Sequence, residues 1–361
     1  ADILMAYLAD RDGAKSFDKT MNDSSVIDIN AVFDYEEMQL AHTTEHTRAY
    51  IKIQDGCNQF CSYCIIPYAR GRVRSRKEED ILREVKGLVA AGYQEIVVTG
   101  IHLSSYGLDF INKDSGDYLQ GVDIRTQAYS KGYLLDILEK INAIEGLKRI
   151  RIGSLEPRII TEEFANRLKQ LDKLCPHFHL SLQSGCNETL KRMNRHYSAG
   201  EFKEKVEILR SVFENPAITT DVIVGFPGET EEEFMQTKAF LEKVNFFEMH
   251  IFKYSRRRGT KEDTMPDQVP EEIKTRRSNE LLELEKEQSK AFRKNFINQN
   301  VKVLLEEEKE IAGKKYWLGH TGEYVKIALS GGEYKKNMLL TVKISGFLAD
   351  DILLGESAAE E

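Results

Sequence analysis

Proline, tryptophan and long apolar runs are scarce in this sequence. Its 361 residues include 7 prolines, 24 glycines and 1 tryptophan, a composition that excludes a collagen-like or low-complexity chain. No apolar run approaches the roughly 20 residues of a membrane span, so we expect no membrane partner. The net charge of −8 argues against nucleic-acid binding through bulk charge, and any such contact has to come from local basic patches.

Cysteine is also sparse, and its distribution is uneven. Five cysteines, an odd number, make a poor disulfide framework for a chain of this length. Such a content suits a reducing, cytoplasmic location. Three of the five, Cys57, Cys61 and Cys64, fall within one short segment, whereas Cys175 and Cys186 stand apart and are predicted to be ordinary buried thiols.

The chain divides into three parts by pattern. Residues 1–46 are weakly patterned and too few to hold a core of their own. In residues 47–296 short β-rich segments alternate with amphipathic ones, which predicts right-handed βαβ units on a parallel sheet. Six such units fall short of the eight in a closed barrel, so we predict an α/β fold, an open (β/α)6 partial TIM barrel followed by a helix. Residues 297–356 predict a small all-β barrel of five short strands.

Local signals place the elements of the larger barrel. The predicted strands cover residues 50–53, 95–99, 149–153, 177–182, 219–225 and 246–251. Ser75, Ser198 and Thr230 each precede a glutamate by three residues, a capping-box pattern that predicts three helix starts. Residues 108–132 predict a long loop, either functional or a mobile insertion.

The clustered cysteines have the spacing C-x3-C-x2-C and follow the first predicted barrel strand. Three thiolates on one loop can bind three irons of a [4Fe–4S] cluster and leave the fourth iron open. Zinc is the alternative, but a structural zinc site normally takes four protein ligands. The sequence has no second C-x2-C pair, and His42 or His46 would have to supply the fourth ligand. The spacing therefore favours a cluster.

A C-x3-C-x2-C loop after the first strand of an open barrel resembles the radical S-adenosylmethionine (SAM) superfamily. Several further blocks resemble its methylthiotransferase branch in the same order: residues 51–57, 65–71, 74–76, 179–185, 190–195 and 221–230. The C-terminal barrel resembles the TRAM module of that family, an RNA-binding unit. The resemblance covers residues 50–355.

The resemblance implies an activity. In the superfamily the open iron binds the amino and carboxylate groups of SAM, and an electron from the cluster gives a 5′-deoxyadenosyl radical. The block from Ile65 to Arg76 is most similar to enzymes that attach a methylthio group at C2 of N6-threonylcarbamoyladenosine beside the tRNA anticodon. The implied partners are the anticodon stem-loop of tRNA, a reducing protein such as flavodoxin or ferredoxin, and a sulfur donor.

Three alternatives remain open at this stage. The substrate could be isopentenyladenosine in tRNA or a ribosomal protein. From another class, the chain could be a cluster-bearing RNA-binding module without catalysis.

One departure from the family pattern concerns the start of the sequence. Members of the family carry an N-terminal domain with three further cysteines and a second [4Fe–4S] cluster for the inserted sulfur. No such triplet precedes Cys57. We therefore expect residues 1–46 to be a remnant of that domain plus a linker, with the ligands of the second cluster outside this sequence.

The resemblance also implies which residues surround SAM. They lie beside the cluster ligands or at predicted strand ends: Tyr63, Thr99, Gly100, Ser154, Glu156, Gln183, Arg195 and Gly225. An arginine suits a carboxylate because it can bind both oxygens. Each position also has an ordinary explanation, such as a cover for the cluster, a tight turn or a surface ion pair.

Two basic runs flank the expected active-site edge and are candidates for phosphate contacts: Arg70, Arg72, Arg74 and Arg76 in the first, and Arg256, Arg257 and Arg258 in the second. Basic runs are also common on solvated surfaces. Tyr316 on the small barrel could stack on an RNA base or belong to its core, and Trp317 is predicted to be core.

Overall fold

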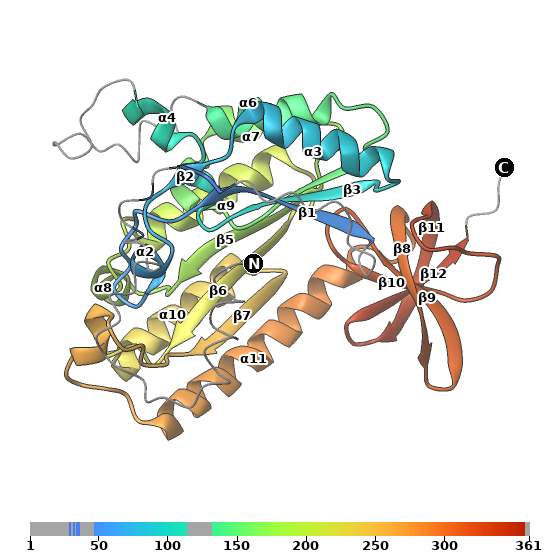
Figure 1. Ribbon diagram of the computed structural model, residues 1–361. Helices are drawn as coiled ribbons and strands as arrows, with labels where there is room; N and C mark the ends of the chain where they lie inside the picture. The colour runs from blue at the N-terminus through green and yellow to red at the C-terminus, as the bar shows by residue number, and fades with distance from the viewer. Residues whose placement is uncertain (1–28, 30–31, 33, 37–46, 114–131, 358–361) are drawn as a thin grey trace, which may run out of the picture.

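The computed structural model describes residues 29, 32, 34–36, 47–113 and 132–357 (Figure 1). Six parallel strands, in chain order, organise the larger part of the molecule: β1 (Arg48–Asp55), β3 (Glu95–Gly100), β4 (Arg149–Ile152), β5 (His177–Gln183), β6 (Ala217–Val224) and β7 (Glu248–Lys253). They confirm all six predicted strands to within about two residues at most ends. The order β1-β3-β4 and β5-β6-β7 is that of successive βαβ units.

The barrel is open and is also split between β4 and β5. The first sheet has the order β2-β1-β3-β4, where β2 (Arg74–Ser75) is a short antiparallel edge, and the second has the order β5-β6-β7. Within the described residues, the strand pairing between the two sheets is limited to the isolated bridges Ile150–Leu174 and Leu155–Leu180. Among the strands that the structure describes, β1 and β7 are not paired. The predicted partial barrel is therefore confirmed.

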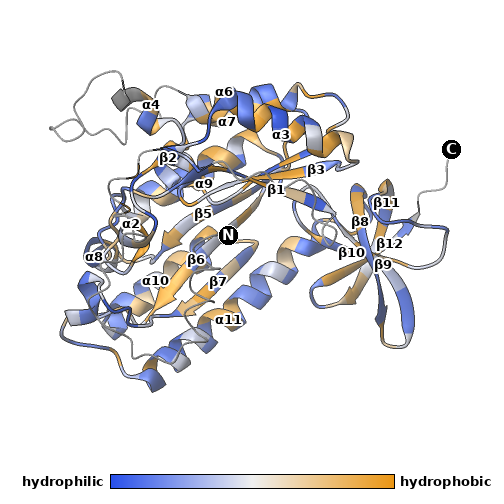
Figure 2. Ribbon diagram, in the orientation of Figure 1, coloured by the Kyte–Doolittle hydropathy of each residue, from blue (hydrophilic) through white to orange (hydrophobic). Residues whose placement is uncertain are grey.

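Helices cover the outer face of both sheets (Figure 1). The described helices are α2 (Ile66–Ala69), α3 (Glu78–Ala90), α4 (Leu108–Lys113), α6 (Tyr133–Asn142), α7 (Glu162–Lys169), α8 (Asn187–Arg192), α9 (Ala199–Val212), α10 (Glu231–Val244) and α11 (Glu271–Lys294). The short α2 and α8 lie instead at the carboxyl ends of the strands (Figure 1). None of these described helices is both long and apolar enough to cross a membrane. In Figure 2 the helices carry both apolar and polar residues, as expected for helices that bury one side against a sheet.

Two of the three predicted capping boxes are confirmed and one is wrong. Ser198 caps α9 and Thr230 caps α10, each accepting a hydrogen bond from the backbone N–H three residues on. Ser75 lies in β2 instead, where its Oγ accepts a hydrogen bond from the Gly107 N–H at 2.8 Å. Helix α3 begins three residues later, after Lys77.

The predicted loop over residues 108–132 is partly wrong. Its first residues form α4 (Leu108–Lys113), which opens at Gly107, a residue with φ +85°. The rest of that range, residues 114–131, lies outside the described residues.

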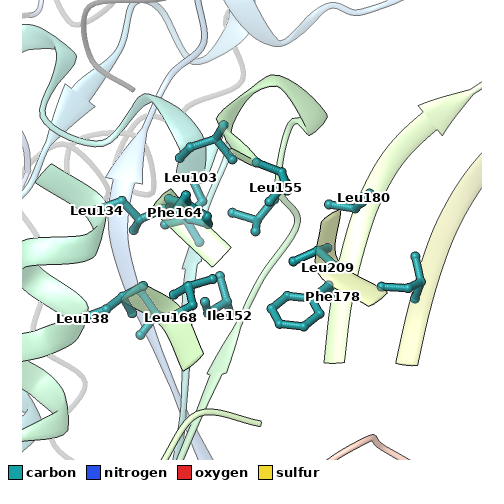
Figure 3. Packing of buried hydrophobic residues seen from close by; sticks show 14 of the residues in the cluster. Leu103, Leu134, Leu138, Ile152, Leu155, Phe164, Leu168, Phe178, Leu180 and Leu209 are labelled. Carbon is teal, nitrogen blue, oxygen red and sulfur yellow. The ribbon is translucent and has the colours of Figure 1, made fainter. Parts of the chain in front are cut away.

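Leucine, isoleucine and phenylalanine side chains fill the space between the sheets and the helices (Figure 3). The alternating residues of β5 show how the sequence places these side chains in the core. Phe178 and Leu180 are fully buried on the helix side, and Phe178 packs on Phe213 with ring centroids 4.9 Å apart. His177 and His179 point to the opposite face, into the barrel, because successive strand residues face opposite sides.

The C-terminal part is a closed barrel of five strands in the order β10-β12-β11-β8-β9. Their bounds are β8 (Asn300–Ile311), β9 (Lys314–His320), β10 (Lys326–Leu329), β11 (Leu339–Ala349) and β12 (Ile352–Ser357). This closed barrel confirms the predicted small all-β fold. Trp317 packs partly buried against its core, in line with its predicted place.

The small barrel contacts the amino-terminal ends of the large barrel's strands. There Arg48, Arg149 and Arg151 surround the buried carboxylate of Glu95, with N···O distances of 3.6, 3.6 and 3.1 Å. Burial alone would raise the pKa of Glu95, but the three arginines hold it below its usual value. Arg48 and Arg151 also lie over the ring of Tyr324, which precedes β10. The small barrel therefore lies at the edge opposite to the carboxyl ends of the strands.

Replacing Leu180 with alanine tests this account of the core. Leu180 has no exposed surface, so we expect the truncation to leave a cavity and lower the free energy of unfolding by about 2–5 kcal/mol. Leu282 on α11, with 39% of its surface exposed, is the matched control, and Leu282→Ala should change stability by about 0.5 kcal/mol or less. Urea denaturation of both variants makes the comparison, and equal effects would contradict the packing described here.

Candidate active site

The three clustered cysteines lie on a loop at the carboxyl end of β1, which we call the cysteine loop (residues 56–65). Gly56 starts it with φ +68°, and an added Cβ would lie 1.8 Å from the Arg72 carbonyl oxygen. Only glycine fits so close an approach. The Cys57 N–H then donates to the Gly71 carbonyl at 3.1 Å, which holds the first thiol at the strand end.

Gln54 ties the start of the cysteine loop to the end of β3. Its buried side-chain amide donates to the Gly56 carbonyl at 2.7 Å and accepts from the His102 N–H at 2.7 Å. Gly100 allows this contact, because an added Cβ there would lie 2.9 Å from the Gln54 Oε1. Thr99, beside it, donates its hydroxyl to a β1 carbonyl at 3.3 Å.

The segment that follows α8 holds the far side of the cysteine loop. The Ser62 Oγ donates to the Arg192 carbonyl at 2.7 Å, and its N–H donates to the Met193 carbonyl at 3.0 Å. The Asn194 amide donates to the Phe60 carbonyl at 2.8 Å. These bonds join a loop of the first sheet to a helix of the second.

Arg195 completes this attachment and contacts a cysteine directly. Its Nη1 donates to the Cys61 Sγ at 3.2 Å, its Nη2 to the Ser181 carbonyl at 3.1 Å, and its Nε to the Tyr197 hydroxyl at 2.9 Å. The guanidinium therefore sets a fixed positive charge against a sulfur that would be negative when bound to a metal.

The cysteines fit an iron–sulfur cluster better than a single ion. A tetrahedral zinc site, with Zn–S bonds of about 2.3 Å, would hold its sulfurs about 3.8 Å apart. Among the described residues, the only three potential ligand atoms within 4.8 Å of one another belong to His179, Asp221 and His250, not to the cysteines. Thiolates that bind separate irons are spaced more widely. His42 and His46, the alternative zinc ligands, lie outside the described residues.

Burial affects the protonation of the loop thiols. It raises the pKa of Cys57 to about 12 and also raises that of Cys64. Both are neutral thiols before a metal binds, so loading the site releases protons. Cys175 and Cys186 are buried elsewhere in the fold.

The strand ends next to the cysteine loop carry several of the residues predicted to surround SAM. Glu156 is buried after β4, and its carboxylate pairs with Arg158 at 2.6 Å. The Arg158 Nη2 lies 3.5 Å from the side-chain oxygen of Gln59 in the cysteine loop. Ser154 is exposed, in the turn between β4 and Glu156. The fold thus brings this group to the edge that holds the cysteines.

Three other predicted SAM residues have clear structural roles. Tyr63 packs edge-on against Phe226, with ring centroids 6.4 Å apart. Gln183 adopts φ +76° where the β5–β6 register shifts. Gly225 adopts φ +71°, and an added Cβ would lie 2.3 Å from the Lys274 Cγ, so packing alone requires glycine. Contact of any of the eight residues with SAM stays a prediction.

The first basic run is not uniformly available to RNA, which corrects the sequence interpretation. Arg74 is buried, and its guanidinium donates to the Arg70 carbonyl at 3.1 Å. Arg76 is 2% exposed and forms an ion pair with Glu84. Arg74 and Arg76 are therefore not available to bind RNA phosphates, because their guanidinium groups make contacts within the protein.

The remaining basic residues lie on the surface near the cysteine loop. Arg70 is half exposed, although it pairs with Asp55 at 2.7 Å. The Arg72 guanidinium lies 4.5 Å from the ring centroid of Phe60. Arg256, Arg257 and Arg258 are exposed. The charge of Arg257 is close enough to Cys64 to lower the pKa of that thiol, against the larger effect of burial.

The structure also corrects the prediction that Tyr316 could stack on an RNA base. Its side chain is 8% exposed and packs with Leu318 and Ile352 in the small barrel. It belongs to the core and is not presented for base stacking.

His102 is a residue at this edge that the sequence interpretation missed. Its Nδ1 lies 2.6 Å from the Ser105 Oγ, whereas its Nε2 is buried without a hydrogen-bond partner. Burial lowers the pKa of His102 to about 4, so the ring is neutral near pH 7. Its position two residues after the end of β3 is the feature of the sequence that could have indicated a place at this edge.

The chain is similar to known proteins over most of its length. Residues 51–241 match the model of the "Radical SAM superfamily". The chain is 40% identical over 311 residues to the threonylcarbamoyladenosine tRNA methylthiotransferase MtaB of Bacillus subtilis, covering 86% of this chain and 65% of that protein. It is 37% identical over 333 residues to the MtaB of Chlamydia pneumoniae, covering 91% and 73%.

A relative with another named product is nearly as similar. The tRNA-2-methylthio-N(6)-dimethylallyladenosine synthase of Clostridium tetani is 37% identical over 303 residues, which cover 84% of this chain and 63% of that protein. The chain belongs to the radical SAM superfamily and, within it, to the MtaB-like methylthiotransferase family. It spans slightly less than two thirds of the length of the B. subtilis relative. Membership supports an iron–sulfur cluster and SAM as cofactors.

Substituting Gly56 tests whether the tight start of the loop positions the cysteines. Gly56→Ala would force Cβ against the Arg72 carbonyl at a positive φ, so we expect the iron content after anaerobic reconstitution to fall by more than half. Gly87→Ala in α3, where an added Cβ meets nothing within 4 Å, is the control. Iron analysis beside thermal unfolding separates the two, and normal iron in Gly56→Ala would contradict the argument.

Proposed function

We propose that this chain carries the radical SAM part of a tRNA methylthiotransferase, in which Cys57, Cys61 and Cys64 bind a [4Fe–4S] cluster whose fourth iron binds SAM. The observation that carries the proposal is the cysteine loop itself. It lies at the carboxyl edge of the strands and is hydrogen-bonded to both sheets, through Gln54 and through Ser62. Three thiolates for four irons leave one coordination position for a second ligand.

The surrounding residues would bind and orient SAM, while the cluster and SAM supply the radical chemistry when bound. In the proposal, Arg195 balances the charge at Cys61 and faces the carboxylate of SAM, which suits a fixed guanidinium. Glu156 and the backbone at Gly100 are proposed to meet the ribose and the amino group. Tyr63 and Gly225 would lie along the rest of the molecule, with Thr99, Ser154 and Gln183 completing the edge.

For the substrate we propose N6-threonylcarbamoyladenosine beside the tRNA anticodon, methylthiolated at C2. The names of the B. subtilis and C. pneumoniae relatives support it. The second candidate is N6-dimethylallyladenosine, because the C. tetani relative is named for that product at 37% identity. Replacing a hydrogen by a methylthio group needs electrons and a sulfur atom, so the proposal includes a reducing partner, a sulfur donor and, as the setting of tRNA modification, the cytoplasm.

Nucleoside analysis of tRNA decides between the two substrates. In a host strain that lacks the gene, the methylthio form of threonylcarbamoyladenosine should disappear and the methylthio form of dimethylallyladenosine should remain. Returning the gene to that strain should restore it. The opposite pattern would assign the other nucleoside, and no change in either would contradict the proposed function.

Replacing one loop cysteine tests the cluster. Cys61→Ser should abolish the brown colour, reduce iron to background and stop SAM cleavage under dithionite, because one thiolate ligand and its contact with Arg195 are lost. The control is Cys186→Ser, which changes a buried cysteine outside the triplet. It should keep the colour, the iron and the SAM cleavage. A colourless native protein that contains zinc and no iron would sink the proposal.

The second basic run tests the RNA side of the proposal. Changing Arg256, Arg257 and Arg258 together to alanine should weaken tRNA binding and reduce the salt slope of log K by about one unit for each lost phosphate contact. SAM cleavage without RNA should persist.

A charge-matched control is available on the outer helical layer. Arg83, Lys86 and Lys140, on α3 and α6, are exposed, and their joint replacement by alanine should leave the salt slope unchanged. If the two triple variants behave alike, the run at 256–258 is an ordinary solvated surface.

A further inference from the structure

A second group of potential metal ligands lies inside the large barrel, on the second sheet. The inward positions of β5, β6 and β7 are polar, and they place His179, Asp221 and His250 on three adjacent strands. In the strand register, Asp221 pairs with His250 and His179 pairs with Thr219. The cysteine loop, by contrast, follows β1 of the first sheet.

The three side chains converge. One ligand atom from each, a ring nitrogen of His179, a carboxylate oxygen of Asp221 and a ring nitrogen of His250, lies within 4.8 Å of the other two. The His179 Nε2 is 3.1 Å from the Asp221 Oδ2, and the two imidazole centroids are 5.6 Å apart. Two imidazoles and a carboxylate at this spacing match the three-ligand set of an open zinc site.

A partner behind His179 fixes the orientation of its ring. The His179 Nδ1 lies 3.0 Å from the Thr219 Oγ1. With the proton on Nδ1 donated to that hydroxyl, the lone pair of Nε2 points toward Asp221. Metal-binding histidines are commonly held in this way through the ring nitrogen that does not bind the metal.

A cavity beside the two histidines leaves space for an ion with water ligands. His179 and His250 line a cavity of about 250 Å³ together with residues of the first sheet, including Tyr50, Val97 and Ser154. Water could therefore complete the coordination sphere. Asp221 pairs with His179. Arg48 and Arg151 also line this cavity, and both are paired with Glu95.

We propose that His179, Asp221 and His250 bind a divalent transition-metal ion of the zinc type, with an open coordination position facing the cavity. This site is additional to the proposed cluster and goes beyond the proposed function. A bound ion would join β5, β6 and β7 through their side chains. The simpler interpretation is a His179–Asp221 hydrogen bond with His250 nearby by chance.

Zinc binding to the iron-reconstituted chain tests the proposal. After equilibrium dialysis against Zn²⁺, metal analysis should find about one zinc per chain in addition to the iron. Zinc-edge X-ray absorption should show nitrogen and oxygen neighbours only, since the site has no thiolate. Zinc with sulfur neighbours, or no zinc above background, would overturn the site.

Single substitutions then test whether these three residues bind the zinc. His250→Ala and Asp221→Asn should each weaken zinc binding at least about tenfold, and Asp221→Asn keeps a hydrogen-bond partner for His179. Phe252→Ala is the matched control, because Phe252 lies two residues along β7, on the same face, and offers no ligand atom.

The thermal midpoint and the iron content of each variant show whether it folds. Added zinc should raise the midpoint of the native chain and of Phe252→Ala, but not that of His250→Ala. Equal zinc affinity in folded His250→Ala and the native chain would overturn the proposal.

Discussion

The hydrogen bonds between the cysteine loop and the segment after α8 are the constraint on which the rest of this site depends. The large barrel is open between β1 and β7, and between β4 and β5 isolated bridges replace a continuous ladder, so the backbone links the two sheets weakly. Ser62, Asn194 and Arg195 make that connection at the carboxyl edge. Because the cysteines belong to one sheet and Arg195 to the other, any movement between the sheets would change the distance between the thiols and the guanidinium, and with it the proposed site for the cluster and SAM.

Charged side chains connect the two barrels at the opposite edge of the large barrel, where its strands begin. Glu95 and its three arginines are buried where the small barrel packs against the strand starts. Arg48 also pairs with Glu306, and Arg149 and Arg151 donate to carbonyls of the small barrel. Removing one partner from such a buried group is strongly destabilising. This arrangement places the small barrel far from the cysteine loop along the strand direction (Figure 1). If both the small barrel and the exposed arginines at 256–258 contact one RNA, that RNA has to follow the side of the large barrel from one edge to the other.

The sequence was most informative where local patterns and tertiary packing agree. The six parallel strands and the capping boxes at Ser198 and Thr230 depend on short-range periodicity and hydrogen bonds, and the structure has them. Ser75 has the same capping pattern but binds the Gly107 N–H instead, a contact 32 residues away that no local pattern encodes. Arg76 also looked like surface charge, because its partner Glu84 comes within reach only once α3 has formed. The inward histidines of β5 and β7 were missed because polar residues at alternate positions also suit a strand facing solvent.

The central claim is that the cysteine loop holds a cluster with one iron left for SAM. Mössbauer spectroscopy of the ⁵⁷Fe-reconstituted chain, with and without SAM, tests it most directly. The account predicts a [4Fe–4S] spectrum in which SAM shifts the signal of one iron and leaves the other three unchanged. A spectrum that does not respond to SAM, in a protein that retains four irons, would contradict it.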